Sequence, residues 1–132
     1  MLRAYSKNIV VNAGNAIPFN VNKIDVGNHI GHSAGSSSII IRNAGFYEVD
    51  FDIAFTTSVA PTEQPVTIQL YADGVAIPDA IIATNVTATE VTNASFTTVI
   101  AASRGFPSQT VSLTVVPSND ITITSVAIGV DQ

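Results

Sequence analysis

Residues 46–55 read FYEVDFDIAF and decide the fold class of this chain. Every second position carries a large apolar side chain, and the positions between them carry mostly acidic or small ones. Side chains on a β-strand point alternately to opposite faces, so this period of two predicts a strand with one face in a core. The core-facing set is Tyr47, Val49, Phe51, Ile53 and Phe55, and the opposite set is Phe46, Glu48, Asp50, Asp52 and Ala54.

The composition extends the strand prediction to the whole chain. The 132 residues include sixteen Val, sixteen Ile and fourteen Thr but only three Leu. β-branched side chains fit a pleated sheet and lose rotamer freedom in a helix, and the usual helix formers Lys, Glu and Arg are scarce. We therefore expect an all-β protein without a long helix.

Turn signals divide the chain into short segments typical of strands. Asp73-Gly74 is a two-residue hairpin signal, and Pro78-Asp79 is expected to interrupt the strand that follows it. Eight to ten strands in one domain, residues 1–132, indicate an antiparallel sandwich or jelly roll. The expected strands are residues 3–11, 17–21, 38–42, 46–58, 66–72, 75–77, 81–86, 90–102, 111–116 and 121–130.

Charge and motif content exclude several classes of function. The net charge is -5 and the five basic residues are scattered, whereas nucleic-acid binding needs clustered positive charge. The absence of Cys excludes a disulfide scaffold and a thiolate metal site. No signal peptide, membrane-spanning run, Gly-x-Ser-x-Gly, Walker or Rossmann pattern occurs, so we expect no membrane insertion and no enzyme activity.

Two features indicate that sister subunits cover part of the surface. Only 11% of the residues are charged, against about 25% in ordinary globular chains. Residues 39–41 (III) and 99–102 (VIAA) lack alternation, and a strand that is apolar on both faces is buried on both. In a lone sandwich one face should contact water. We therefore interpret these stretches as a surface buried against other copies, with covering loops as the alternative.

Residues 44–53, AGFYEVDFDI, resemble the Gly-x-Tyr-x-Val-x-Phe strand of the tumour necrosis factor and complement-head superfamily. The resemblance covers about residues 8–130. Residues 30–36 resemble the loop before the family's second strand, residues 70–78 its hairpin followed by Ile-Pro, and residues 121–130 its closing strand. The most similar branch is the bacterial and phage one, typified by the C-terminal domain of the collagen-like exosporium glycoprotein. The resemblance implies a ten-stranded jelly roll that forms a tight threefold homotrimer and serves adhesion, display or capsid and fibre structure.

The sequence departs from that branch because no collagen-like or coiled-coil stem precedes the expected jelly roll. We therefore expect a phage virion accessory subunit at the virion surface, as a capsid decoration, a head fibre or a tail-fibre head. A spore-surface or cell-surface protein is the alternative. Residues 1–7 are then a candidate anchoring segment, and the loops at residues 27–37, 59–65 and 104–110 are the expected presented surface.

Glu48, Asp50 and Asp52 form a row of like charges on one face of one strand, with neighbours about 6.8 Å apart. Such a row is costly unless water, cations or basic side chains neutralise it. Its oxygen ligands suit Ca²⁺, which the row could share around a trimer axis. The alternative is a solvent-facing or trimer-interface surface, which the resemblance favours. The candidate basic partners are Arg3, Arg42 and Arg104.

Two further sets of residues are candidate binding sites. His29 and His32 form His-x-x-His in a Gly-rich loop, where three copies around an axis could bind a metal. Local structural hydrogen bonds are the alternative, and the resemblance favours a structural role for His32. A receptor- or glycan-binding head needs an exposed aromatic ring to stack on a sugar, and the chain has no Trp. The remaining candidates for that role are Tyr5, Phe19 and Phe106.

Overall fold

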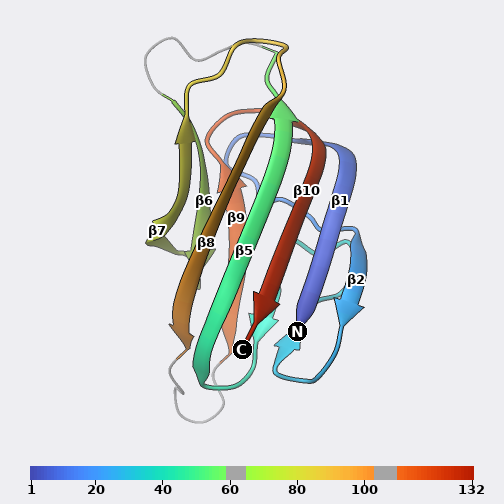
Figure 1. Ribbon diagram of the computed structural model, residues 1–132, viewed down its shortest axis with the longest axis vertical. Helices are drawn as coiled ribbons and strands as arrows, with labels where there is room; N and C mark the ends of the chain where they lie inside the picture. Colours follow the sequence, from blue (N-terminus) through green and yellow to red (C-terminus); the bar gives the residue numbers. More distant parts are fainter. Residues whose placement is uncertain (59–64, 103–109) are drawn as a thin grey trace.

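The computed structural model describes residues 1–58, 65–102 and 110–132, which form ten strands and, within these ranges, no helix. The strands lie in two five-stranded antiparallel sheets packed face to face (Figure 1), which confirms the expected all-β jelly-roll sandwich. The strands are β1 (Leu2–Val11), β2 (Val21–Asp25), β3 (Ile30–Gly31), β4 (Ile39–Ile41), β5 (Gly45–Thr56), β6 (Val66–Ala72), β7 (Val75–Thr84), β8 (Thr92–Ala102), β9 (Val111–Pro117) and β10 (Ile121–Asp131). The described part of the chain contains no helix long and apolar enough to cross a membrane.

Both sheets join strands that are distant in the sequence. The front sheet has the order β2-β1-β10-β5-β8, and the rear sheet has the order β3-β4-β9-β6-β7. The first and last strands pair directly, with Leu2 opposite Val130. The two ends of the chain therefore lie side by side at one end of the sandwich (Figure 1).

The core lies between the two sheets, and β5 supplies much of it as the sequence predicts. Its five core-facing side chains are at most 3% exposed, whereas Phe46 on the opposite face is 72% exposed. The rings of Phe51 and Phe96 stack with their centroids 5.0 Å apart. Ile68 and Leu70 of the rear sheet are fully buried and close the core from the other side.

The connection between β1 and β2 differs from the prediction of a strand at residues 17–21, because residues 17–20 form no strand and β2 begins at Val21. Ile17 and Phe19 are nevertheless buried, with exposed fractions of 0% and 1%. Pro18 between them has no N–H and cannot donate to a strand ladder. Single backbone hydrogen bonds hold the segment instead, such as the one from Phe19 N to Ser36 O at 3.2 Å. The segment therefore fills the core from a loop conformation.

The interruption expected at Pro78-Asp79 is found in the pairing but not in the strand: β7 continues through it, while the register with β6 passes from Ala76 to Ile81 and skips the residues between. β7 is the edge of the rear sheet, where the missing N–H of proline costs no ladder hydrogen bond. Gln69 stabilises the irregular pairing beside it, since its Nε2 donates to Ile77 O at 2.7 Å and to Ala80 O at 3.2 Å. The hairpin predicted at Asp73-Gly74 is confirmed, and both residues have positive φ, 50° and 79°.

Residues 1–7, the candidate anchoring segment, lie within the jelly roll. From Leu2 onwards they belong to β1, which pairs with β10 on one side and with β2 on the other. Ser6 adds two hydrogen bonds, because its Oγ donates to Pro18 O at 2.7 Å and accepts from Asn20 N at 2.8 Å. Any contact of this segment with a larger particle would therefore be made from within the front sheet.

Candidate functional site

The acidic row of β5 lies on the side of the front sheet that points away from the rear sheet, called the outer face below. Glu48 and Asp52 are exposed, and Asp50 is half-buried. Asp50 lies between Gly129 of β10 and Thr97 of β8 in the strand register. Most side chains that flank the row are small, so the face is shallow. The flanking residues are Ser125, Ala127, Gly129 and Asp131 of β10 and Asn93, Ser95, Thr97, Val99 and Ala101 of β8.

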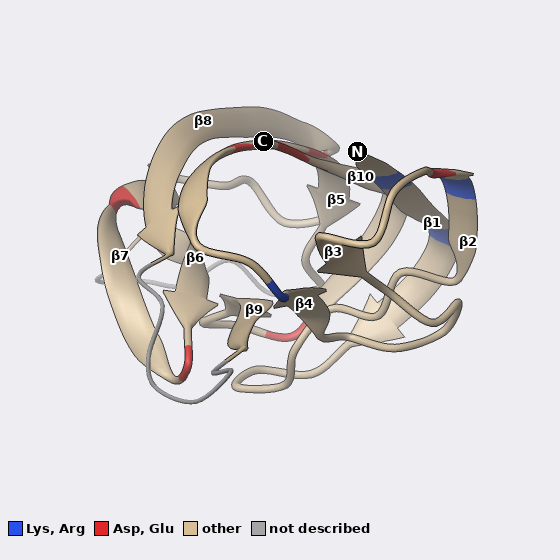
Figure 2. Ribbon diagram, turned by 90° about the horizontal axis from the view of Figure 1, so that it is seen from below, with Lys and Arg blue, Asp and Glu red and all other residues tan. Residues whose placement is uncertain are grey.

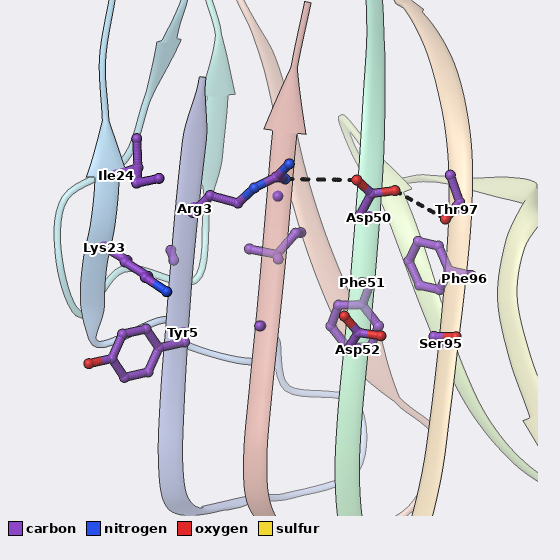
Figure 3. Close-up of a pocket in the computed structure, with 14 residues that line it drawn as sticks. Arg3, Tyr5, Lys23, Ile24, Asp50, Phe51, Asp52, Ser95, Phe96 and Thr97 are labelled. Carbon is purple, nitrogen blue, oxygen red and sulfur yellow. Dashed lines mark hydrogen bonds and ion pairs between the residues drawn. The ribbon is translucent and has the colours of Figure 1, made fainter.

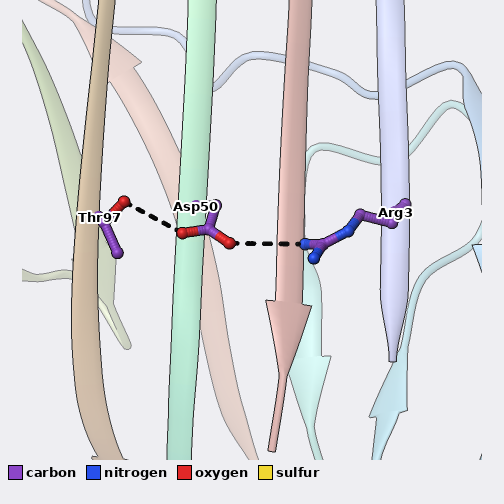
Figure 4. A network of polar contacts seen from close by, with 3 residues as sticks. All are labelled: Arg3, Asp50 and Thr97. Atoms are coloured by element: carbon purple, nitrogen blue, oxygen red, sulfur yellow. Dashed lines mark hydrogen bonds and ion pairs between the residues drawn. The ribbon is translucent and has the colours of Figure 1, made fainter.

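Asp50 is the centre of a short polar chain that crosses three strands of the outer face (Figure 4). Arg3 Nη1 lies 3.8 Å from Asp50 Oδ2, and Thr97 Oγ1 donates to Asp50 Oδ1 at 3.0 Å. The Arg3 side chain reaches Asp50 by passing over β10 at Gly129. A Cβ added at Gly129 would overlap the Arg3 guanidinium and lie 2.5 Å from Cζ. The structure therefore brings together Arg3 and Asp50, one of the pairs that the sequence offered.

The other two acids of the row have no such partner within the part of the chain that the structure describes. Arg3 with Asp50 is the single ion pair there. Arg42 instead directly follows β4 of the rear sheet, where its guanidinium covers Gly31, and Arg104 falls outside the described residues. Among residues 1–58, 65–102 and 110–132 no three His, Asp or Glu side chains are placed to hold a metal.

Two adjoining shallow depressions run along the outer face. The first encloses about 540 Å³, with Tyr5 and Lys23 on one side of β10 and Asp50 and Asp52 on the other (Figure 3). The second encloses about 420 Å³ and continues past Tyr5 and Asp52 towards Lys7. Tyr5 is half-buried and borders both depressions, so this candidate aromatic residue does lie on an accessible surface.

One end of the outer face, called the apolar end below, exposes two large apolar side chains beside Glu48 and Asp131. Phe46 and Val99 are 72% and 59% exposed, the register pairs Phe46 with Ala101, and it pairs Glu48 with Val99. Phe46 and Val99 are therefore diagonal neighbours on one face of two adjacent strands. Within the single chain neither is covered, so loops of the described residues do not explain the apolar stretch at residues 99–102. In the other such stretch Ile40 is half-buried while its two neighbours are fully buried.

The two histidines are each engaged by a different partner. His29 Nδ1 makes a short contact with Gln132 Oε1. His32 is 8% exposed, and its Nε2 lies 2.8 Å from Ser36 O while its Nδ1 contacts Asn22 Oδ1. In the single chain His32 thus bonds to residues near it in the sequence, whereas His29 contacts the C-terminal residue, which is distant in the sequence. Metal binding by His29 and His32 would require these contacts to be replaced.

The structure contradicts the expectation that Phe19 is a surface aromatic. Its side chain is 1% exposed and its ring lies edge-on to His32, with centroids 6.2 Å apart. The buried position follows from the loop conformation of its backbone, which also accepts a hydrogen bond from Gly35 N at 2.8 Å. Phe106 lies outside the described residues, as do most of the expected loops at residues 59–65 and 104–110.

The sequence pattern identified the acidic row but missed the residues around it. Gly129, Thr97 and Lys23 become neighbours of the row only through pairing between strands far apart in the sequence. Alternation within β1 does place Arg3, Tyr5 and Lys7 on one face. The alternation of β1 therefore predicts that these three side chains share a face, but it does not reveal which strand lies alongside β1.

Solved structures share this fold, although no family model and no curated protein matches the sequence. The globular domain of zebrafish complement 1qA protein has a TM-score of 0.64 at 12% identity, over 96% of this chain and 92% of its own. Eiger TNF from S. frugiperda has a TM-score of 0.62 at 10% identity, over 96% and 90%. PRD1 vertex protein P5 has a TM-score of 0.54 at 10% identity, over 96% and 93%. These similarities show that the chain has the jelly-roll fold of complement-head and tumour necrosis factor domains; the exosporium branch stays a prediction.

Proposed function

We propose that this chain is a non-enzymatic assembly subunit whose copies form a threefold homotrimer through the outer face of the front sheet. The observation that carries the proposal is the exposed apolar end of that face, formed by Phe46 and Val99. Covering an aliphatic or aromatic side chain of this size contributes about 1.5–3 kcal/mol. A threefold assembly would cover three copies of each side chain.

The remainder of the outer face suits a close approach by another chain. Ala127 and Ser95 keep it shallow beside the Arg3 side chain that lies over Gly129, so another chain can approach closely over this part of the face. Obligate interfaces between subunits usually bury more than about 2,000 Å² in total. The superfamily resemblance also assigns β5 to the sheet nearer the trimer axis. Apolar contact and shape therefore support the same face.

The test is the solution mass of variants that make the apolar end polar without adding charge. We expect Phe46→Gln combined with Val99→Gln to dissociate the assembly at concentrations where the wild type stays intact. The matched control is Val75→Gln combined with Ile81→Gln, two exposed apolar residues of β7 in the rear sheet. Circular dichroism verifies that all variants fold. Equal dissociation by both pairs, or by neither, would contradict the proposed interface.

We further propose that the trimer is an accessory subunit of a phage virion. Support comes from the fold shared with PRD1 vertex protein P5 and from the low charge content, which suits a protein largely covered by neighbours. An antiserum against the purified chain should label particles in phage lysates under immunogold electron microscopy. Label confined to spores or cell surfaces would favour the exosporium-like alternative.

A receptor- or glycan-binding module is the second candidate, and Tyr5 is the observation that favours it. Its ring borders two depressions that also contain Asp52, an arrangement in which a sugar could stack and donate hydrogen bonds. Assembly and glycan binding at this face compete, because a trimer that buries Tyr5 leaves no room for a sugar. Binding on a glycan array that is lost in Tyr5→Ala but kept in Phe46→Gln would favour the binding module. Reproducible turnover of generic esterase or glycosidase substrates would contradict both candidates.

A further inference from the structure

The outer face of the front sheet is divided into a basic half and an acidic half. The basic half consists of Arg3 and Lys7 on β1 and Lys23 on β2, which are exposed or half-buried. Figure 2 shows blue bands on these strands to one side and red bands on the strands beside the C-terminus. A red band also lies at the end of β2, where Asp25 is exposed and is the one acidic residue of β1 and β2. The acidic half consists of Glu48, Asp50 and Asp52 on β5 and Asp131 on β10.

A strip without charge separates the two halves over most of their length. It is formed by β10, whose outer-facing residues include Ser125, Ala127 and Gly129. Arg3 reaches across the strip only because Gly129 has no side chain, and its contact with Asp50 is long at 3.8 Å. Both side chains of this pair are more than one-third exposed, and such pairs contribute roughly 0–1 kcal/mol. A partner chain can therefore replace this contact at little cost.

Most charges of the two halves are not neutralised within the chain. Among the residues that the structure describes, no acidic side chain lies within ion-pair distance of Lys7 or Lys23, and no basic one within that distance of Glu48 or Asp52. These charges therefore remain available to a second molecule. Because positive and negative charges occupy separate halves of the outer face, the basic half of one copy can lie against the acidic half of another.

We propose that neighbouring copies dock with the basic half of one outer face against the acidic half of the next, so that Lys7 and Lys23 of one copy neutralise Glu48 and Asp52 of another. This inference rests on the proposed self-assembly and adds its register and its partner groups. Repeated head to tail, this contact between two different patches closes into a ring when the rotation between copies permits. A two-fold pair would make the same contact twice, and the mass of the assembly distinguishes the pair from the threefold ring. An arrangement that places basic half against basic half and acidic half against acidic half is disfavoured by repulsion, so the charges select one register.

The test reverses each half separately and then both together. The first variant carries Lys7→Glu and Lys23→Glu, the second carries Glu48→Lys and Asp52→Lys, and the third carries all four substitutions. Asp50 is left unchanged because Thr97 and Arg3 contact it within the chain. Glu90→Lys, on an exposed residue between β7 and β8, tests whether a charge reversal away from the outer face affects assembly, with half the net-charge change of the Glu48 and Asp52 variant. Circular dichroism verifies that each variant folds, and sedimentation velocity gives the concentration at which each assembly dissociates.

We expect each two-site reversal to raise that dissociation concentration about tenfold or more at low salt, because like charges then face each other. The four-site variant restores opposite signs and should return to within about threefold of the wild type. In about 0.5 M NaCl the difference between wild type and the two-site variants should shrink, because salt screens exposed charges. Glu90→Lys should behave as the wild type.

The outcomes separate this inference from the function on which it rests. A wild type that is monomeric at every concentration overturns both the charge register and the proposed assembly function. A stable wild-type trimer whose dissociation is unmoved by either two-site reversal overturns the charge register and leaves the assembly proposal intact. Weakening by both reversals without recovery in the four-site variant also overturns it, because the two halves would then not face each other. Weakening by each reversal and recovery in the four-site variant support it.

Discussion

Arg3 Nη1 lies 3.8 Å from Asp50 Oδ2 although a whole strand separates β1 from β5. The contact depends on Gly129 of the intervening β10, since any larger residue there would occupy the space of the guanidinium. The outer face is thus built so that a basic side chain lies flat over the sheet instead of standing out from it.

Gly129→Ala should displace the Arg3 side chain while costing less than about 1 kcal/mol of unfolding free energy. The reason is that the new methyl group meets the flexible end of a side chain, and the backbone of Gly129 is not in the left-handed region. The matched control is Gly74→Ala at φ +79°, where a Cβ meets no atom but the backbone itself becomes strained. That change should cost about 1–2 kcal/mol. Chemical denaturation measures both, and a larger loss for Gly129→Ala than for Gly74→Ala would contradict this explanation.

Thr57→Val should leave stability unchanged or raise it by up to about 1 kcal/mol. Thr57 is 2% exposed, and its Oγ1 has no hydrogen-bond partner within the described residues, so the hydroxyl is buried at a cost. Thr98→Val is the matched control, because Thr98 is also buried but its Oγ1 donates to Asp79 Oδ2 at 3.0 Å. The control should lose about 1.5–3 kcal/mol, as for a hydrogen bond to a charged group. Thermal unfolding measures the stability of the two variants against the wild type. A destabilised Thr57→Val would show that the Thr57 hydroxyl has a partner.

Tyr47 should make the fold sensitive to alkaline pH. Burial raises the pKa of the Tyr47 hydroxyl above its ordinary value of 10.0. The unfolded chain then loses this proton at a lower pH than the folded chain. The stabilising contribution is therefore complete below pH 10 and is lost as the pH rises through 10 towards the folded-state pKa.

Tyr47→Phe isolates that contribution. At neutral pH it should cost about 1 kcal/mol, because Tyr47 Oη donates to Asn43 O at 2.7 Å. Between about pH 9 and 11 the unfolding free energy of the variant should fall less than that of the wild type. Urea denaturation across this range measures the difference. Parallel pH profiles would mean that Tyr47 ionises equally in the folded and unfolded chains.

Removal of divalent metal should leave the assembly intact. If basic residues of a neighbouring copy neutralise Glu48 and Asp52, no Ca²⁺ is required to offset their repulsion. Light scattering with and without EDTA at equal ionic strength is the measurement. A mass that falls in EDTA and recovers on addition of Ca²⁺ would instead make the acidic row a shared metal site, with carboxylate oxygens of several copies as ligands.

Local sequence patterns predicted the parts of the fold that local physics determines. The alternation of β5 placed Val49 in the core and Glu48 outside it, and Asp73-Gly74 located a hairpin, because one residue's direction or φ decides each. The prediction that Phe19 is a surface aromatic was wrong for the opposite reason. Its burial depends on hydrogen bonds to Ser36 and Gly35, which no local period encodes.

The candidate site was predictable only in part for a related reason. The acidic row lies on one strand, so alternation reveals it directly. Its neighbours Arg3 and Gly129 are brought to it by pairing of β1 and β5 with β10, strands that are far apart in the sequence. The family resemblance supplied the correct fold, but neither it nor the local pattern indicated that Arg3 crosses a glycine.

The central claim is self-assembly through the outer face, and its most direct test is the mass of the unmodified chain in solution. Sedimentation equilibrium over a range of low micromolar concentrations is the measurement. A stable mass of three times 13.7 kDa is the result expected here, with dissociation only on extreme dilution. A mass of 13.7 kDa at all these concentrations would contradict the account, leave Phe46 and Val99 exposed without an assembly role, and favour the glycan-binding candidate.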